Sequence, residues 1–147
     1  MIKRLLVSCA VLLGAAGMAC GGDSGTADLP VKPQIVTDRD SIVDQAIYAG
    51  QTKTQTLQVT DKGQQDLVVS TYALTGDSAI VLLNSTLAQA DGSSSNTVKS
   101  NKTAFISMTC KPTSVNQTVN ATLTINSNAE NKPTKTVTVS CGPAVAP

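Results

Sequence analysis

The chain has 147 residues with a formal net charge of +1, which excludes the basic footprint of nucleic-acid binding and allows one domain with a modest core. Aromatic residues make up 2% of the chain, too few for a platform of stacked rings. The chain has no histidine, so catalysis by a Ser-His-Asp or Cys-His arrangement is excluded.

The N-terminal segment 1–19 has the layout of an export signal. Lys3 and Arg4 give a positive start, an apolar stretch follows at 5–13, and small residues lead to Cys20. The apolar stretch is too short to span a bilayer. Cys20, followed by a Gly-Gly pair, resembles the processing site of bacterial lipoproteins, in which the signal is cleaved just before a cysteine that is then acylated. We therefore predict a cleaved signal peptide and lipid attachment at Cys20.

The sequence offers two alternatives to this interpretation. Gly17 stands at position −3, where lipoproteins usually carry Leu, so an ordinary secretory cleavage would leave Cys20 as a free thiol. The stretch 6–9 also matches the lipoprotein motif, but too little apolar length precedes it to engage the export machinery. Residue Gly21 favours the outer membrane, because Asp at this position marks inner-membrane retention in many Gram-negative lipoproteins. The expected location is the bacterial cell envelope.

Residues 20–33 are rich in Gly, Ser, Asp and Pro and are expected to form a flexible tether. A domain is expected over 34–142, followed by a C-terminal tail at 143–147. Alternation of apolar and polar residues dominates the domain, and strands are expected at 54–60, 66–72, 79–83, 104–110, 119–125 and 137–141. A polar loop is expected at 84–97. This order predicts an all-β, immunoglobulin-like antiparallel β-sandwich of about seven strands.

The four cysteines have separate expected fates. Cys9 leaves with the signal and Cys20 takes the lipid, which leaves Cys110 and Cys141 as a pair in an oxidising compartment. A zinc site would need further ligands, and there is no histidine to supply them. Both cysteines fall on the inward phase of their strands. If the last two strands form a hairpin, the two sulfurs meet at one end of the sandwich, so we predict a Cys110–Cys141 disulfide.

The expected domain resembles a known family of immunoglobulin-like domains. The matching stretches are 49–51, 54–60, 62–63, 67–69, 108–112, 121–128 and 137–142. They resemble the ASH or Hydin-type domains that also occur in bacterial choice-of-anchor D proteins. Cys110 stands where that family has a core Phe, and Cys141 replaces a small residue, often Gly. The family's early Phe-Gly signature is absent around 43–44. The resemblance implies an immunoglobulin-like fold with a binding or scaffolding role and brings no catalytic residues.

Other polar motifs in the chain are assigned no site. Asp38, Asp40 and Asp44 resemble a fragment of a calcium loop, but the EF-hand Gly and terminal Glu are missing and Arg39 opposes cation binding. These side chains are therefore expected to be solvated charges before the first strands. Glu130 is the only Glu, in a predicted turn, which leaves little basis for paired-carboxylate chemistry. We expect no catalytic residues, no metal and no cofactor.

The function expected from these features is that of a non-catalytic, lipid-anchored envelope protein. Its immunoglobulin-like domain would serve protein binding, scaffolding or surface display, with the membrane and an unidentified protein as partners and no nucleic acid. The alternative is a small-ligand or glycan receptor that uses the 84–97 loop. A protein binder is expected to show an apolar patch or an open edge strand, and a receptor a concave pocket.

Overall fold

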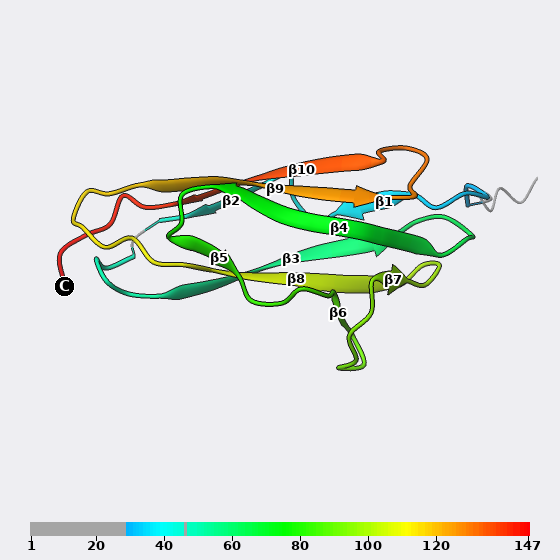
Figure 1. Ribbon diagram of the computed structural model, residues 1–147, viewed down its shortest axis with the longest axis horizontal. Helices are drawn as coiled ribbons and strands as arrows, with labels where there is room; N and C mark the ends of the chain where they lie inside the picture. Colours follow the sequence, from blue (N-terminus) through cyan, green and yellow to red (C-terminus); the bar gives the residue numbers. More distant parts are fainter. Residues whose placement is uncertain (1–28, 46) are drawn as a thin grey trace, which may run out of the picture.

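The computed structural model describes residues 29–45 and 47–147. The predicted signal peptide, Cys20 and most of the predicted tether lie outside these residues. The described chain contains ten strands and no helix, arranged as two packed sheets (Figure 1). The predicted all-β, immunoglobulin-like sandwich is confirmed.

The two sheets, which we call sheet A and sheet B, have five strands each. Sheet A has the order β1-β3-β8-β5, and β6 pairs with β8 beside β5. Its strands are β1 (Ile35–Thr37), β3 (Lys53–Asp61), β8 (Thr103–Cys110), β5 (Ile80–Leu82) and β6 (Ala88–Gln89). Sheet B has the order β2-β10-β9-β4-β7. Its strands are β2 (Ser41–Asp44), β10 (Thr134–Cys141), β9 (Val119–Ser127), β4 (Leu67–Gly76) and β7 (Thr97–Val98).

The long strands lie where the alternation predicts them. β8 buries every second residue from Ala104 to Cys110, and β9 and β10 do the same, so the inward phases assigned to these strands are confirmed. β9 and β10 form the expected antiparallel hairpin. The large side chains of the core come from both sheets: Leu57, Val59, Ile106, Met108, Leu123, Ile125, Val137 and Val139. Burial of these side chains is the main force that holds the sheets together.

Four short strands were not predicted. β1 and β2 have three and four residues, and β6 and β7 have two each, within or beside the predicted polar loop. The chain crosses from sheet A to sheet B between β1 and β2. β2 then pairs in parallel with β10, whereas the other pairs are antiparallel. The outermost strands of both sheets are therefore short, and they cover only part of the long strands β3, β8 and β4.

Segments beyond the predicted domain boundaries also pack on the sandwich. The backbone N–H of Gln64 donates to Pro30, and that of Glu130 donates to Pro33, at 2.8 and 2.9 Å. These bonds hold residues 29–33 at the end formed by the β3–β4 and β9–β10 turns. At the opposite end Ala144 is buried, and Val145 donates to the Ile47 carbonyl at 2.9 Å.

Candidate functional site

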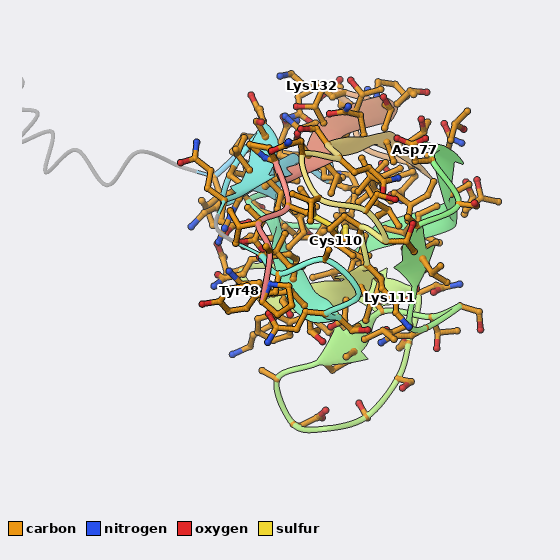
Figure 2. The ribbon with its side chains drawn as sticks, turned by 90° about the vertical axis from the view of Figure 1, so that its left-hand side faces the viewer. Tyr48, Asp77, Cys110, Lys111 and Lys132 are labelled. Atoms are coloured by element: carbon orange, nitrogen blue, oxygen red, sulfur yellow. A yellow bond between two sulfur atoms is a disulfide. The ribbon has the colours of Figure 1, made fainter. Side chains whose placement is uncertain are left out.

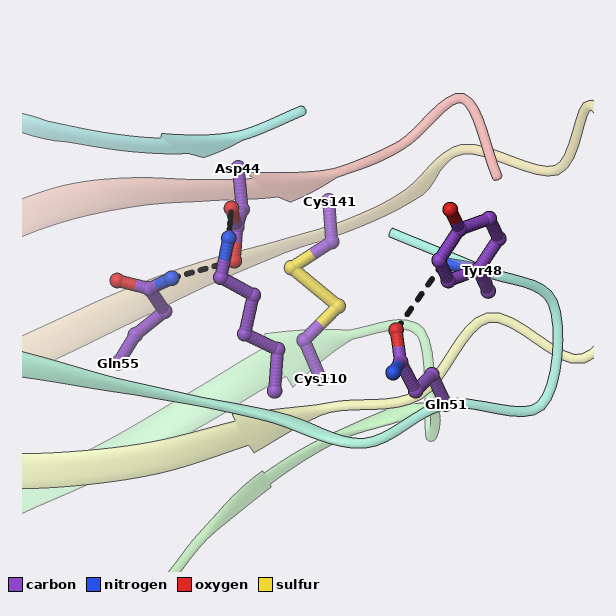
Figure 3. A network of polar contacts seen from close by, with 7 residues as sticks. Asp44, Tyr48, Gln51, Gln55, Cys110 and Cys141 are labelled. Carbon is purple, nitrogen blue, oxygen red and sulfur yellow. Dashed lines mark hydrogen bonds and ion pairs between the residues drawn. A yellow bond between two sulfur atoms is a disulfide. The ribbon is translucent and has the colours of Figure 1, made fainter. Parts of the chain in front are cut away.

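The predicted disulfide joins the two sheets at one end of the sandwich, which we call the disulfide end. Cys110 is the last residue of β8 in sheet A, and Cys141 is the last residue of β10 in sheet B. Their sulfurs are bonded, with the Cα atoms 6.5 Å apart and a sequence separation of 31. Figure 2 looks onto this end of the molecule, and Figure 3 shows the bond from close by. The bridge is buried and closes the hydrophobic core at this end.

A polar contact runs beside the disulfide and also joins the sheets. Asp44 is the register partner of Cys141, and Lys53 is the register partner of Cys110. The Asp44 carboxylate accepts hydrogen bonds from the side chains of Lys53 and Gln55 (Figure 3). The edge strand β2 of sheet B is thereby attached to β3 of sheet A, one strand away from the covalent bond.

This contact corrects the expectation that the aspartates before the first strands are solvated. The Asp44 side chain is 6% exposed, because β2 turns the even-numbered residues Ile42 and Asp44 toward the core. Asp40 does lie at the surface, where its carboxylate pairs with the Lys135 ammonium. Asp38 pairs with Arg39 at 2.6 Å.

Loops at the disulfide end are held by backbone hydrogen bonds. Gly50 donates to the Pro112 carbonyl and Asn116 donates to the Ala144 carbonyl, both at 2.7 Å. The amide of Tyr48 is bonded to the Gln51 side chain at 3.4 Å (Figure 3). These bonds connect segments 47–51, 112–116 and 144–145. The loops at this end are therefore joined to one another by hydrogen bonds.

An apolar patch lies on the outer face of sheet A, at its β5 edge. Val81 and Leu83 are 53% and 55% exposed. Val81 is the register partner of Thr109, and the Leu83 amide donates to the Ser107 carbonyl at 2.9 Å. Phe105 is half-buried and lies two residues further along β8, on the same outward phase. We call Val81, Leu83 and Phe105 the β5–β8 patch.

The predicted polar loop at 84–97 lines a concave site of about 650 Å³. A small hairpin, closed by pairing of Ala88 with Ser94, projects from the sandwich beside β6 (Figure 1). Together with the turn before β8 it encloses the concavity. Its lining residues are Gln89, Ala90, Asp91, Ser93, Ser95, Thr97, Lys99, Lys102 and Thr103.

The charges of this concave site come from three side chains. The hydroxyl and amide of Ser93 donate to Asp91, and these hydrogen bonds lower the pKa of that carboxyl below its ordinary value. Lys99 pairs with Asp66 at 2.7 Å, outside the lining. Lys102 has no side-chain partner among the described residues. The site therefore offers hydroxyls, one carboxylate and one free ammonium to a small polar molecule.

The described residues show neither a metal-binding cluster nor a membrane-spanning helix. No group of three or more His, Cys, Asp or Glu side chains within 29–45 and 47–147 is arranged to hold a metal ion. In the same part of the chain, no helix has the length and apolar character needed to cross a membrane.

Comparison with known proteins finds relatives of the fold. No family model and no curated protein matches the sequence. Among solved structures, the ASH/PapD-like domain 7 of human CEP192 has a TM-score of 0.53 at 13% identity, over 96% of this chain and 99% of that domain. The fold is of the ASH/PapD-like immunoglobulin type. The ASH-like part of the predicted resemblance is therefore confirmed for the fold.

Two bacterial structures share this ASH/PapD-like fold over part of their length. A protein of unknown function from Porphyromonas gingivalis W83 has a TM-score of 0.56 at 12% identity, over 80% of this chain and 50% of that one. The secreted serine protease VesC from Vibrio cholerae has a TM-score of 0.50 at 11% identity, over 76% of this chain and 23% of the protease. The chain thus spans half or less of these two proteins, and the likeness concerns the fold alone.

Proposed function

We propose that this protein is a non-catalytic, lipid-anchored envelope protein whose immunoglobulin-like domain binds another protein through the β5–β8 patch. The observation that carries the proposal is the position of this patch beside an open sheet edge. Aliphatic and aromatic side chains there present apolar area, and the outer side of β5 has no further strand among the described residues. An ASH/PapD-like fold is consistent with a binding or scaffolding role.

The geometry of the domain suits an attachment at its N-terminal end. Residues 29–33 lie at one end of the sandwich, while Ile80 of β5 is the register partner of Cys110 at the other. β3, which runs between the two ends, has nine residues and a length of about 30 Å. A lipid on Cys20 would therefore be joined to the domain at the end away from the β5–β8 patch, which leaves the patch accessible to a partner.

The sequence supports the non-catalytic and envelope parts of this proposal. Without histidine the chain cannot build the commonest acid–base and nucleophile-activating arrangements. The disulfide fits a protein that folds in an oxidising compartment. With Gly rather than Asp after Cys20, the outer membrane is the favoured destination.

The partner-binding role is tested by photo-crosslinking in intact cells. A photoreactive residue at position 81 should yield a discrete crosslinked protein, while one at position 36 should not. Val36 is the matched control, because it is 42% exposed on the outer face of β1, at the opposite edge of the same sheet. Leu83→Asp should remove the product obtained at position 81. Absence of any product at 81, or equal products at 81 and 36, would overturn this role.

A small-ligand or glycan receptor is the second candidate function, and the concave site lined by the 84–97 loop favours it. A cavity of about 650 Å³ lies within the size range of small-molecule sites. Binding of a polar ligand there should be weakened by Lys102→Ala and unaffected by Leu83→Asp. Isothermal titration against a panel of acidic and neutral sugars distinguishes this function from protein binding.

A further inference from the structure

The charged residues on the strands have an unusual distribution. Asp44, Lys53, Asp61 and Lys135 are the only charged residues on strands in the described chain. All four lie at inward positions of the alternation, including Lys135, whose side chain is 9% exposed. The outward positions of the strands therefore carry no charge, whereas the exposed face of a sheet ordinarily carries charged residues.

The outer face of sheet B is one of the two neutral surfaces. We define it as the outward residues of β2, β10, β9 and β4. Its centre is formed by β9 and β10, with Asn120, Thr122, Thr124, Thr136, Thr138 and Ser140 pointing outward. Thr122 pairs in register with Thr138, and Thr124 with Thr136, so hydroxyl groups form rows across the strands. A shallow concavity of about 350 Å³ lies over the Thr122–Thr138 row.

We propose that the outer face of sheet B binds the same face of a second copy of this chain. In a two-fold interface each residue near the axis meets its own symmetry mate, so a charge there would face a like charge. A hydroxyl or amide side chain both donates and accepts hydrogen bonds and can pair with its own copy. Depletion of charge at the centre is also the compositional mark of protein interfaces.

The rim of the face fits the same proposal. Asp40 precedes β2 at one border of the face, and Asp77 follows β4 at another. Charged residues are therefore found at the borders of the face and not within it. The outer face of sheet A is less suited to flat packing, because the hairpin closed by Ala88 and Ser94 projects on that side (Figure 1). The second copy is therefore assigned to sheet B and not to sheet A.

The size of the face sets the strength of the contact. β9 has nine residues, a length of about 30 Å, and four strands about 4.8 Å apart give a width of about 20 Å. The resulting area of about 600 Å² per copy lies below the roughly 800 Å² of a typical stable interface. The contact is thus a weak, reversible dimer, which attachment of both copies to one membrane would promote. Promotion of the dimer by a shared membrane rests on the proposed lipid anchor, whereas the dimer contact itself does not.

The association is measured by sedimentation velocity from about 5 to about 500 μM, with the chain carrying Cys20→Ser so that neither lipid nor an extra thiol contributes. We expect a concentration-dependent monomer–dimer equilibrium. Thr136→Lys and Thr136→Glu should each weaken it by at least about tenfold, because like charges meet near the axis. An equimolar mixture of the two variants should restore association. Thr56→Lys, on the outer face of β3 in sheet A, is the matched control and should leave it unchanged.

A second readout does not depend on the charge variants. A photoreactive residue at position 136 of the full chain should crosslink two copies of the protein in cells, and one at position 56 should not. A monomer at every concentration, association that Thr136→Lys leaves intact, a mixture that stays monomeric, or self-crosslinking from position 56 alone would each overturn the proposal. The sedimentation results depend neither on lipid attachment, because the chain carries Cys20→Ser, nor on the β5–β8 patch.

Discussion

The Asp44 carboxylate and the Lys53 ammonium pair across the two sheets, directly beside the disulfide. Asp44 is the register partner of one cysteine and Lys53 of the other, so the ion pair and the covalent bond are neighbours (Figure 3). The disulfide attaches β10 to β8, and the ion pair attaches β2 to β3. An inward charge on an edge strand also opposes pairing of β2 with other chains.

The two members of this pair should differ in their effect on stability. Lys53→Met leaves the buried Asp44 carboxylate with Gln55 as its remaining side-chain partner and should cost about 1–3 kcal/mol of unfolding free energy. Asp44→Asn should cost less, because Lys53 is 48% exposed and regains water. Urea unfolding of both variants measures the order. A larger loss for Asp44→Asn would contradict this assignment of the buried partner.

Loss of the disulfide should destabilise the domain strongly. The bond joins residues 31 positions apart, and a loop of this size adds about 3–4 kcal/mol in the chain-entropy model. Cys110→Ser removes the bond and also places a hydroxyl in the core. Calorimetry should show a Tm lower by about 10–20 °C. A Tm equal to that of the unmodified protein would show that the bond contributes nothing to folding.

Protonation of the Asp40 carboxylate should lower the stability of the domain in acid. The Lys135 ammonium, by its hydrogen bond and then by its charge, lowers the pKa of the Asp40 carboxyl below 3.8 in the folded protein. The unfolded chain therefore binds this proton more readily, and the contribution present above about pH 4 is lost as the pH falls through the folded pKa. Asp40→Asn should flatten this part of a urea-unfolding profile between about pH 2 and pH 7. An identical profile would exclude the pair as a cause.

Gly63 should be required for docking of residues 29–33. A Cβ at position 63 would lie 2.1 Å from the Lys32 carbonyl oxygen and 2.8 Å from the Pro33 Cα, so the segment must move. Gly63→Ala should therefore release the segment and speed hydrogen exchange of the Gln64 and Glu130 amides, which donate to the Pro30 and Pro33 carbonyls, while exchange in β9 stays slow. Unchanged exchange at these two amides would mean that docking of the segment does not depend on this close approach.

The sequence predicts the long strands because their alternation extends over five or more residues. β8, β9 and β10 each show it, and their inward phases lead to the disulfide. Strands of two to four residues, such as β1 and β2, are too short to show a period. The crossover between them depends on packing that no local pattern records. Turn-forming and polar residues dominate the sequence around β6 and β7, so these two strands could not be predicted from it either.

The candidate surfaces were predictable only in part. Alternation on β8 places Phe105 outward, but its place on the same outer face as Val81 depends on β5 being the neighbour of β8, which requires the strand order. Asp44 shares the phase of Ile42, a signal that could have revealed its burial. Its partner Lys53 belongs to the other sheet and could not be inferred from spacing. The concave site likewise depends on how the 88–94 hairpin projects.

Membrane attachment through Cys20 is the central claim about this protein, and acylation measures it most directly. Cells that express the wild type or Cys20→Ala are labelled with a clickable fatty acid and separated into membrane and soluble fractions. The wild-type protein should carry label and sediment with membranes, and Cys20→Ala should be unlabelled and soluble. An unlabelled wild type, together with a variant that still sediments with membranes, would contradict the claim.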